Sequence, residues 1–120
     1  MSASVPPRRV VVLGSTGSIG RQTLSVIAAF APYWQVVGLA AGKNVTLLTE
    51  QAETFRPDAV WFEGAETVGW SGPGRLQPPA EMVSRPDVDT VVVATSGRAG
   101  LVPTLEALRA GKAVALATKE

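Results

Sequence analysis

The stretch that decides the fold is Val10-Val11-Val12-Leu13-Gly14-Ser15-Thr16-Gly17-Ser18-Ile19-Gly20. Its four consecutive apolar residues are typical of a strand that is buried on both faces, as in a parallel sheet. The glycines allow the backbone to turn sharply and to approach a ligand where a Cβ atom would clash. A helix is predicted to begin near Ser18. Its unpaired N–H groups and positive dipole end favour an anion, best a phosphate.

This strand, turn and helix predict the first unit of a dinucleotide-binding fold, with the spacing G-x-x-G-x-x-G in place of the commoner G-x-G-x-x-G. A plain tight turn is the alternative interpretation of closely spaced glycines. Their position between a β-rich segment and an amphipathic one favours phosphate binding. A P-loop is excluded, because Arg21 follows Gly20 where that motif requires a Lys-Ser/Thr pair.

The composition is that of an ordinary globular protein, since 46% of the 120 residues are hydrophobic and 18% are charged. A net charge of +1 provides no field to recruit nucleic acid or a membrane surface. The sequence has no cysteine and no histidine, which excludes disulfides, thiolate nucleophiles and imidazole acid–base catalysis from it. It shows no signal-peptide core and no membrane-spanning run. We therefore expect one cytoplasmic domain that binds neither nucleic acid nor membrane.

Apolar runs alternate with amphipathic segments along the chain. Strands are predicted at residues 10–13, 34–41, 59–62, 90–95 and 113–117, and helices from about 18 to 31, at 45–55 and at 101–110. Asn44 is the predicted N-cap of the second helix, and Gly111 is predicted to end the third. This alternation predicts an α/β fold: a Rossmann-like, doubly wound, mostly parallel sheet with helices on both faces.

Two helix faces and one long connection complete this prediction. The apolar face of the first helix is expected to consist of Thr23, Ile27 and Phe30, with Leu24 and Ala31 beside it. The apolar face of the last helix is expected to consist of Leu101, Leu105 and Leu108. Between residues 63 and 89, glycines and prolines break every periodicity. We interpret this segment as a surface connection with a short helix near 80–84.

Ligands of such a sheet bind in the crevice outside the carboxyl ends of its strands. Four stretches follow strand ends here: 14–20, 42–44, 95–100 and 118–120. They are far apart in the sequence, yet a parallel sheet brings them to one edge. This expected convergence is stronger evidence for a site than any single motif.

The end of the second strand distinguishes between nicotinamide cofactors. A domain specific for NAD usually has an Asp or Glu there to hold the ribose 2′-hydroxyl. This chain instead has Gly42, Lys43 and Asn44. A missing carboxylate and a present cation suit a 2′-phosphate, so we predict NADP(H). The alternative is a helix N-terminus with a solvated lysine and a capping asparagine.

The motifs together resemble the N-terminal domain of the 1-deoxy-D-xylulose 5-phosphate reductoisomerase family. The matching stretches are Leu13-Gly14-Ser15-Thr16-Gly17-Ser18-Ile19-Gly20, Ala41-Gly42-Lys43-Asn44-Val45, Gly97-x-Ala99-Gly100-Leu101-x-Pro103-Thr104-Leu105-x-Ala107, Gly111-Lys112 and Leu116-Ala117-x-Lys119-Glu120. The glycine turn alone is shared by many dehydrogenases. The ordered series across nearly the whole chain is specific to this family.

The resemblance implies an NADPH-dependent enzyme of isoprenoid biosynthesis that rearranges 1-deoxy-D-xylulose 5-phosphate, a phosphorylated sugar, with a divalent metal and then reduces the product with NADPH. It also implies residue roles. Thr16, Gly17, Ser18 and Ile19 would contact the cofactor phosphates, and Gly42, Lys43 and Asn44 the adenosine end with its 2′-phosphate. Thr118 and Glu120 would flank the nicotinamide, and Lys119 would reach the substrate.

One motif departs from the family pattern. The family sequence ends Ala-Asn-Lys-Glu, whereas this chain has Thr118 in place of the asparagine. A threonine offers one hydroxyl where asparagine offers a carbonyl and an amide. The resemblance also places the metal ligands (for Mg or Mn), the substrate-phosphate site and a lid beyond residue 120. We therefore expect residues 1–120 to be the N-terminal, NADP(H)-binding part of a longer enzyme, inactive alone and prone to self-association or homodimer formation.

Two other functions fit the glycine turn. Semialdehyde dehydrogenases and related NADP oxidoreductases open with the same spacing, although the Gly42–Asn44 and Lys119-Glu120 stretches count against them. A non-catalytic nucleotide-sensing module would need only a free-standing domain of this length.

Overall fold

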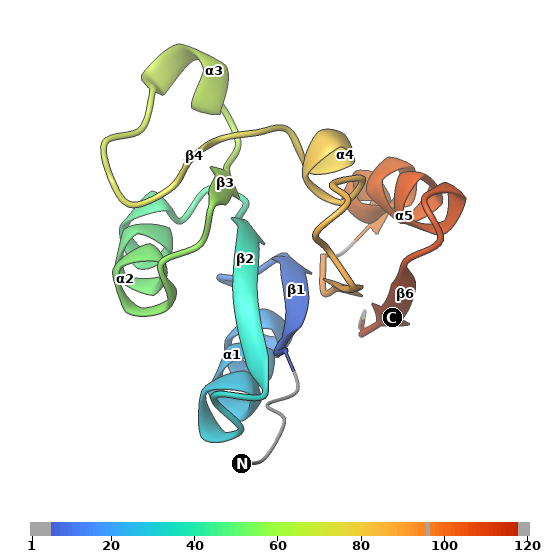
Figure 1. Cartoon of the computed structure of the whole chain (residues 1–120). Coiled ribbons are helices and arrows are strands. Elements are labelled where there is room, and N and C mark those ends of the chain that lie inside the picture. The colour runs from blue at the N-terminus through green and yellow to red at the C-terminus, as the bar shows by residue number, and fades with distance from the viewer. Residues whose placement is uncertain (1–5, 96, 118–120) are drawn as a thin grey trace.

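The computed structural model describes residues 6–95 and 97–117 (Figure 1). The strands are β1 (Arg8–Leu13), β2 (Trp34–Ala40), β3 (Ala59–Trp61), β4 (Arg75–Leu76), β5 (Thr90–Val93) and β6 (Ala113–Leu116). The helices are α1 (Ser18–Ala29), α2 (Val45–Phe55), α3 (Ala65–Val68), α4 (Pro79–Met82), the 3-10 turn η1 (Gly97–Gly100) and α5 (Leu101–Arg109). The predicted strands and long helices are thus confirmed, with ends that differ by one or two residues, apart from an earlier start for β1.

The strands form one sheet in the order β4-β3-β2-β1-β5-β6, and every pair in it is parallel. The chain runs outward from β1 through β2 and β3 to β4, then returns to start again at β5 beside β1. This reversal is the topological switch point of a doubly wound fold, where ligands bind. The predicted Rossmann-like architecture is confirmed.

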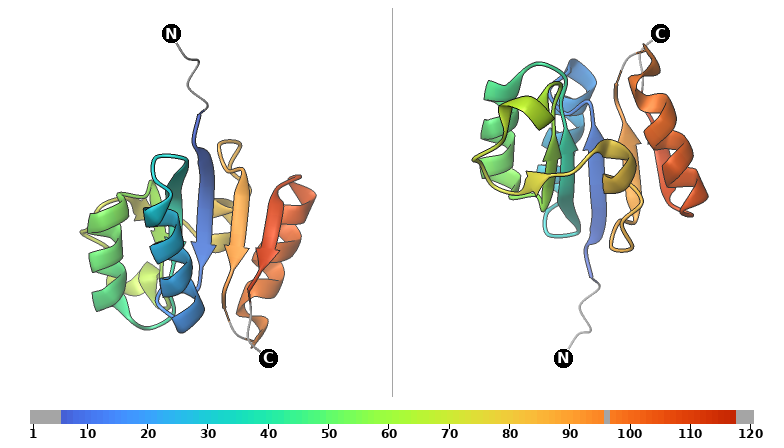
Figure 2. Two further views of the ribbon diagram at one scale, coloured as in Figure 1. Left: turned by 90° about the horizontal axis from the view of Figure 1, so that it is seen from below. Right: turned by 90° about the horizontal axis from the view of Figure 1, so that it is seen from above.

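β1 lies at the centre of the sheet, where its backbone pairs with β2 on one side and β5 on the other. Its side chains alternate between the two faces. Val10 and Val12 join a core with helices α1 and α2, whereas Val11 and Leu13 join a second core with α4 and α5. The two views in Figure 2 show these opposite faces of the sheet and the helices that cover them.

The segment 63–89 is more than the predicted surface connection. It contains the two short helices α3 and α4 and the edge strand β4. Ala65, Met82, Val83 and Val88 are all buried, so the segment contributes to both cores. The sheet therefore has a strand that was not predicted, and the short helix begins at Pro79.

The predicted faces of the first and last helices are wrong in part. Leu24 and Ile27 are the large buried residues of α1, whereas Phe30 follows the end of the helix at Ala29 and is 57% exposed. In α5, the residues turned to the sheet are Pro103 and Ala107. The predicted leucine face of α5 lies on the other side of the helix and is exposed.

Candidate dinucleotide-binding site

The glycine turn joins the ends of three neighbouring strands. The amides of Gly14 and Ser15 both donate to the carbonyl oxygen of Ala40, at the end of β2, over 2.7 and 3.0 Å. Gly14 has φ +81°, and a Cβ atom on it would lie 2.7 Å from the carbonyl group of Ala94, just after β5. Only glycine satisfies both the backbone conformation and the close approach.

The other two glycines of the motif have different surroundings. A Cβ atom on Gly20 would overlap the carbonyl oxygen of Gly14 and would lie 2.8 Å from the Cα atom of Ser15. Gly20 therefore allows the first turn of α1 to pack directly on the glycine turn. Gly17 is open: its nearest neighbour would be the Gly14 oxygen at 3.7 Å. Gly17 leaves space where a ligand would approach.

The start of α1 presents backbone donors that the described residues leave unused. No side chain caps this helix at Gly17. Within residues 6–95 and 97–117, the amides of Thr16, Ser18 and Ile19 have no hydrogen-bond acceptor. Free N–H groups at the positive end of a 12-residue helix form an anion site.

The end of β2 leads into the start of α2. The Oδ1 atom of Asn44 accepts a hydrogen bond from the Leu47 amide over 3.0 Å, which confirms the predicted N-cap. The carboxamide nitrogen of Asn44 is not used in this cap, so it can donate to a ligand. Lys43 is exposed, and a Cβ atom on Gly42 would meet no atom within 4 Å. This corner is therefore open and carries a positive charge.

The two regions line one cleft at the carboxyl edge of the sheet. A hollow of about 280 Å³ is lined by Gly14, Thr16, Gly17, Gly42, Ala94, Thr95 and Ala99. An adjoining hollow of about 260 Å³ shares Gly42, Thr95 and Ala99 with it. Residues from the predicted stretches 14–20, 42–44 and 95–100 thus meet at this edge. Those that line the hollows are Gly14, Thr16, Gly17, Gly42, Thr95 and Ala99, whereas the predicted Ser18, Ile19, Lys43 and Asn44 line neither. Thr118, Lys119 and Glu120 lie outside the described residues.

Gln51 is a buried polar residue near the turn that was not among the predicted site residues. It is only 7% exposed, and its Nε2 atom donates to the carbonyl oxygen of Ser15 over 2.8 Å. It lies on the buried face of α2, beside Leu48 and Ala52. A glutamine at an apolar position of an amphipathic helix was the available signal.

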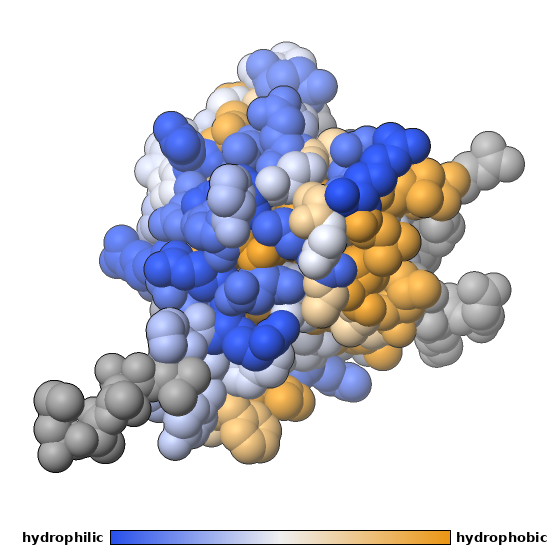
Figure 3. Space-filling view, turned by 45° about the vertical axis from the view of Figure 1, so that its right-hand side comes forward, coloured by the Kyte–Doolittle hydropathy of each residue, from blue (hydrophilic) through white to orange (hydrophobic). Residues whose placement is uncertain are grey.

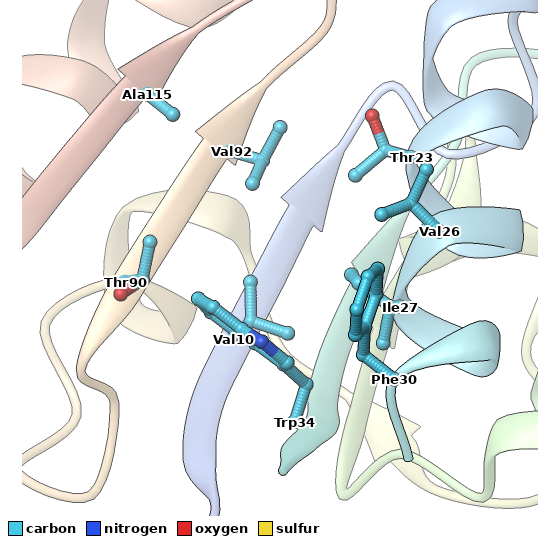
Figure 4. Close-up of a pocket in the computed structure, with 9 residues that line it drawn as sticks. All are labelled: Val10, Thr23, Val26, Ile27, Phe30, Trp34, Thr90, Val92 and Ala115. Atoms are coloured by element: carbon cyan, nitrogen blue, oxygen red, sulfur yellow. The ribbon is translucent and has the colours of Figure 1, made fainter.

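A larger groove lies elsewhere. About 480 Å³ in volume, it opens on the α1 face of the sheet, between α1 and the strands β1, β5 and β6 (Figure 4). Its lining is almost entirely apolar, with Val26, Phe30, Trp34 and Val92 among the contributors. No charged residue lines it, and its polar lining residues are Thr23, Thr90 and Trp34, so we do not assign the cofactor phosphates to it.

Within the described residues, no group of three or more His, Cys, Asp or Glu side chains could hold a metal ion. The helices found there are all too short or too polar to span a lipid bilayer.

A parallel sheet with a glycine turn at its switch point, free amides at the start of α1 and an open basic corner after β2 defines a dinucleotide-binding, Rossmann-like domain. The chain matches the family model of 1-deoxy-D-xylulose 5-phosphate reductoisomerase over residues 10–72 and 74–120. It belongs to this family. The family assignment decides against a semialdehyde-dehydrogenase-like protein.

Curated relatives carry the same description. The 1-deoxy-D-xylulose 5-phosphate reductoisomerase of Pelotomaculum thermopropionicum is 43% identical over 128 residues, an alignment that covers 94% of this chain and 32% of the relative. The chain therefore spans about a third of the length of such relatives.

Solved structures of the family are similar to the present one. The Zymomonas mobilis reductoisomerase in complex with NADPH has a TM-score of 0.80 at 34% identity, covering 93% of this chain and 32% of that one. A reductoisomerase in complex with NADPH, fosmidomycin and magnesium has a TM-score of 0.80 at 30% identity, covering 92% and 30%.

Proposed function

We propose that this chain is the NADPH-binding domain of an enzyme that converts 1-deoxy-D-xylulose 5-phosphate to 2-C-methyl-D-erythritol 4-phosphate in isoprenoid biosynthesis. The observation that carries the proposal is the shared cleft: the glycine turn and the corner at Gly42 line the same hollow. Free amides lie beside one end and Lys43 beside the other. The family assignment and the NADPH complexes of similar structures support it.

A different set of residues binds each part of the cofactor. The amides around Thr16, Gly17, Ser18 and Ile19 bind the pyrophosphate, and Gly42, Lys43 and Asn44 hold the adenosine end. Lys43 supplies the charge for a 2′-phosphate, and the carboxamide nitrogen of Asn44 supplies a donor. From the family resemblance, Thr118 and Glu120 flank the nicotinamide and Lys119 reaches the phosphorylated sugar.

NADPH supplies the hydride when it is bound. The divalent metal and the phosphate group of the sugar are held, in this proposal, by parts of the enzyme outside residues 1–120. The chain then binds the cofactor weakly on its own and does not turn over substrate. We place the enzyme in the cytoplasm, which suits a sequence without cysteine.

The test is a titration of the ¹⁵N-labelled chain with NADPH, followed by NMR, which detects weak binding. The amides of Thr16, Ser18, Ile19 and Lys43 are expected to show the largest shifts. Binding that left these amides unchanged would contradict the proposal. In a parallel assay with sugar phosphate, magnesium and NADPH, turnover by the 120-residue chain would contradict its expected inactivity.

We also propose that the isolated chain self-associates through the exposed side of α5. Leu101, Val102, Leu105 and Leu108 are each between 44% and 58% exposed on this one helix. Figure 3 shows the apolar surface that gathers on this side of the molecule. Contiguous apolar patches of this kind mark interaction surfaces, and two copies of the helix would cover one another.

Leu105→Lys is therefore expected to shift the chain to monomer in light scattering, toward a mass of 12.5 kDa. The matched control is Val68→Lys, because Val68 is 73% exposed on the separate helix α3. A monodisperse monomer before any substitution would contradict this prediction.

A further inference from the structure

We propose that Gln51 is a positioning residue for the cofactor, because it orients the backbone amide of Thr16 toward the cleft. This inference rests on the proposed NADPH binding and adds a residue to it. Gln51 itself makes no part of the cleft lining. Its effect would pass through one peptide group of the glycine turn.

The contact that carries the inference joins two elements far apart in the chain. The carboxamide nitrogen of Gln51, on α2, donates to the carbonyl oxygen of Ser15 over 2.8 Å. Ser15 is fully buried and Gln51 is 7% exposed, so no bulk water competes for this hydrogen bond. The contact therefore fixes the direction of the Ser15 carbonyl.

The direction of that carbonyl determines the direction of the next amide. A trans peptide is planar, and its C=O and N–H groups point in opposite directions. When Gln51 holds the Ser15 oxygen toward α2, the Thr16 N–H is turned away from α2. Thr16 lines the cleft, and its amide has no acceptor among the described residues. The peptide plane is thus set for an acceptor that comes from the cleft.

The chemistry of the site indicates that stability alone does not explain a glutamine here. Its Oε1 atom and the Ser15 hydroxyl are both buried with no partner among the described residues. Such half-satisfied polar groups oppose folding. An apolar side chain would suit the neighbouring Leu48 and Ala52 better. What glutamine alone provides at this position is the donor to Ser15.

The same helix connects the two ends of the site. The N-terminus of α2 carries Asn44, next to Lys43, and its second turn carries Gln51. The corner that binds the adenosine 2′-phosphate and the residue that orients the pyrophosphate donor thus belong to one rigid element. Because they are separate contacts, their effects on ligands are separable.

The experiment compares two ligands with Gln51→Leu, which keeps the size of the side chain and removes the donor. NADPH contains the pyrophosphate, whereas 2′-AMP carries only the adenosine and its 2′-phosphate. By NMR titration, the affinity for NADPH is expected to fall about tenfold, because the Thr16 amide is no longer oriented to donate a hydrogen bond to the charged pyrophosphate. The affinity for 2′-AMP is expected to stay within about twofold of the original value, and the Thr16 amide resonance is expected to move.

Two further variants separate positioning from stability. Leu48→Val removes a methylene from the same buried face of α2 and lowers stability without touching Ser15. It is expected to keep both affinities. Gln51→Met also removes the donor, and the methionine side chain adapts more easily to its surroundings. It is expected to give the same result as Gln51→Leu, and it replaces that variant in the experiment if Gln51→Leu does not fold.

The outcomes distinguish this inference from the proposed function. If the unaltered chain binds NADPH and Gln51→Leu or Gln51→Met binds it equally well, the inference is wrong and the proposed function stands. A parallel loss of NADPH and 2′-AMP affinity would also overturn it, since that would show a general structural role. Failure of the unaltered chain to bind NADPH would overturn both.

Discussion

Gly20→Ala is expected to destabilise the chain by about 2 kcal/mol and to abolish detectable NADPH binding. Helix propensity alone predicts the opposite change in stability, because alanine is intrinsically favoured over glycine inside a helix by about 1 kcal/mol. Here the added Cβ atom would overlap the carbonyl oxygen of Gly14. Helix α1 or the turn must therefore move, and either movement displaces the free amides. Urea unfolding followed by tryptophan fluorescence measures the stability.

Gly17→Ala is the matched control for this prediction. Gly17 has φ −78°, which alanine adopts without strain, and its Cβ atom would come no closer than 3.7 Å to the Gly14 oxygen. Its stability is expected to change by less than about 1 kcal/mol. If Gly20→Ala were as stable as Gly17→Ala, the close packing of α1 on the turn would be contradicted.

Lys43→Gln is expected to lower the affinity for NADPH about tenfold and to leave the affinity for NADH unchanged. The two cofactors differ only in the 2′-phosphate, so the ratio of their dissociation constants isolates the contact with Lys43. Because Lys43 is exposed, its interaction with a phosphate is screened by ions. The preference for NADPH should therefore decrease as salt is added. Titrations with both cofactors at two salt concentrations measure these effects.

Arg75→Gln provides the control for net charge. It removes one positive charge from an exposed residue at the start of β4, at the opposite edge of the parallel sheet from the cleft. Its NADPH affinity is expected to stay unchanged. An equal loss of NADPH and NADH affinity in Lys43→Gln would show that the lysine supports the fold of this corner, not the recognition of a 2′-phosphate.

Local sequence determined most of the architecture. The run 10–13 with its glycine turn, the Asn44 cap and the glycine after α5 are each encoded within a few neighbouring residues. Alternation of such segments leaves a parallel, doubly wound sheet as the natural arrangement. The parallel sheet then dictates that strand ends meet at one edge. For this reason the shared cleft of Thr16, Gly17 and Gly42 could be predicted without coordinates.

Other features depended on contacts between distant segments. β4 has only Arg75 and Leu76, too few for any periodicity, and exists because its backbone pairs with β3. The leucine face of α5 was visible in the sequence, but the packing buries Pro103 and Ala107 instead and leaves the leucines exposed.

The hydrogen bond from Gln51 to Ser15 joins residues 36 positions apart. The sequence by itself determined the local units and the edge at which they act, because backbone conformation and hydrophobic alternation are short-range properties. Only the tertiary structure decided which helix face is buried and which buried side chain orients the turn, since these depend on how separate elements pack against one another.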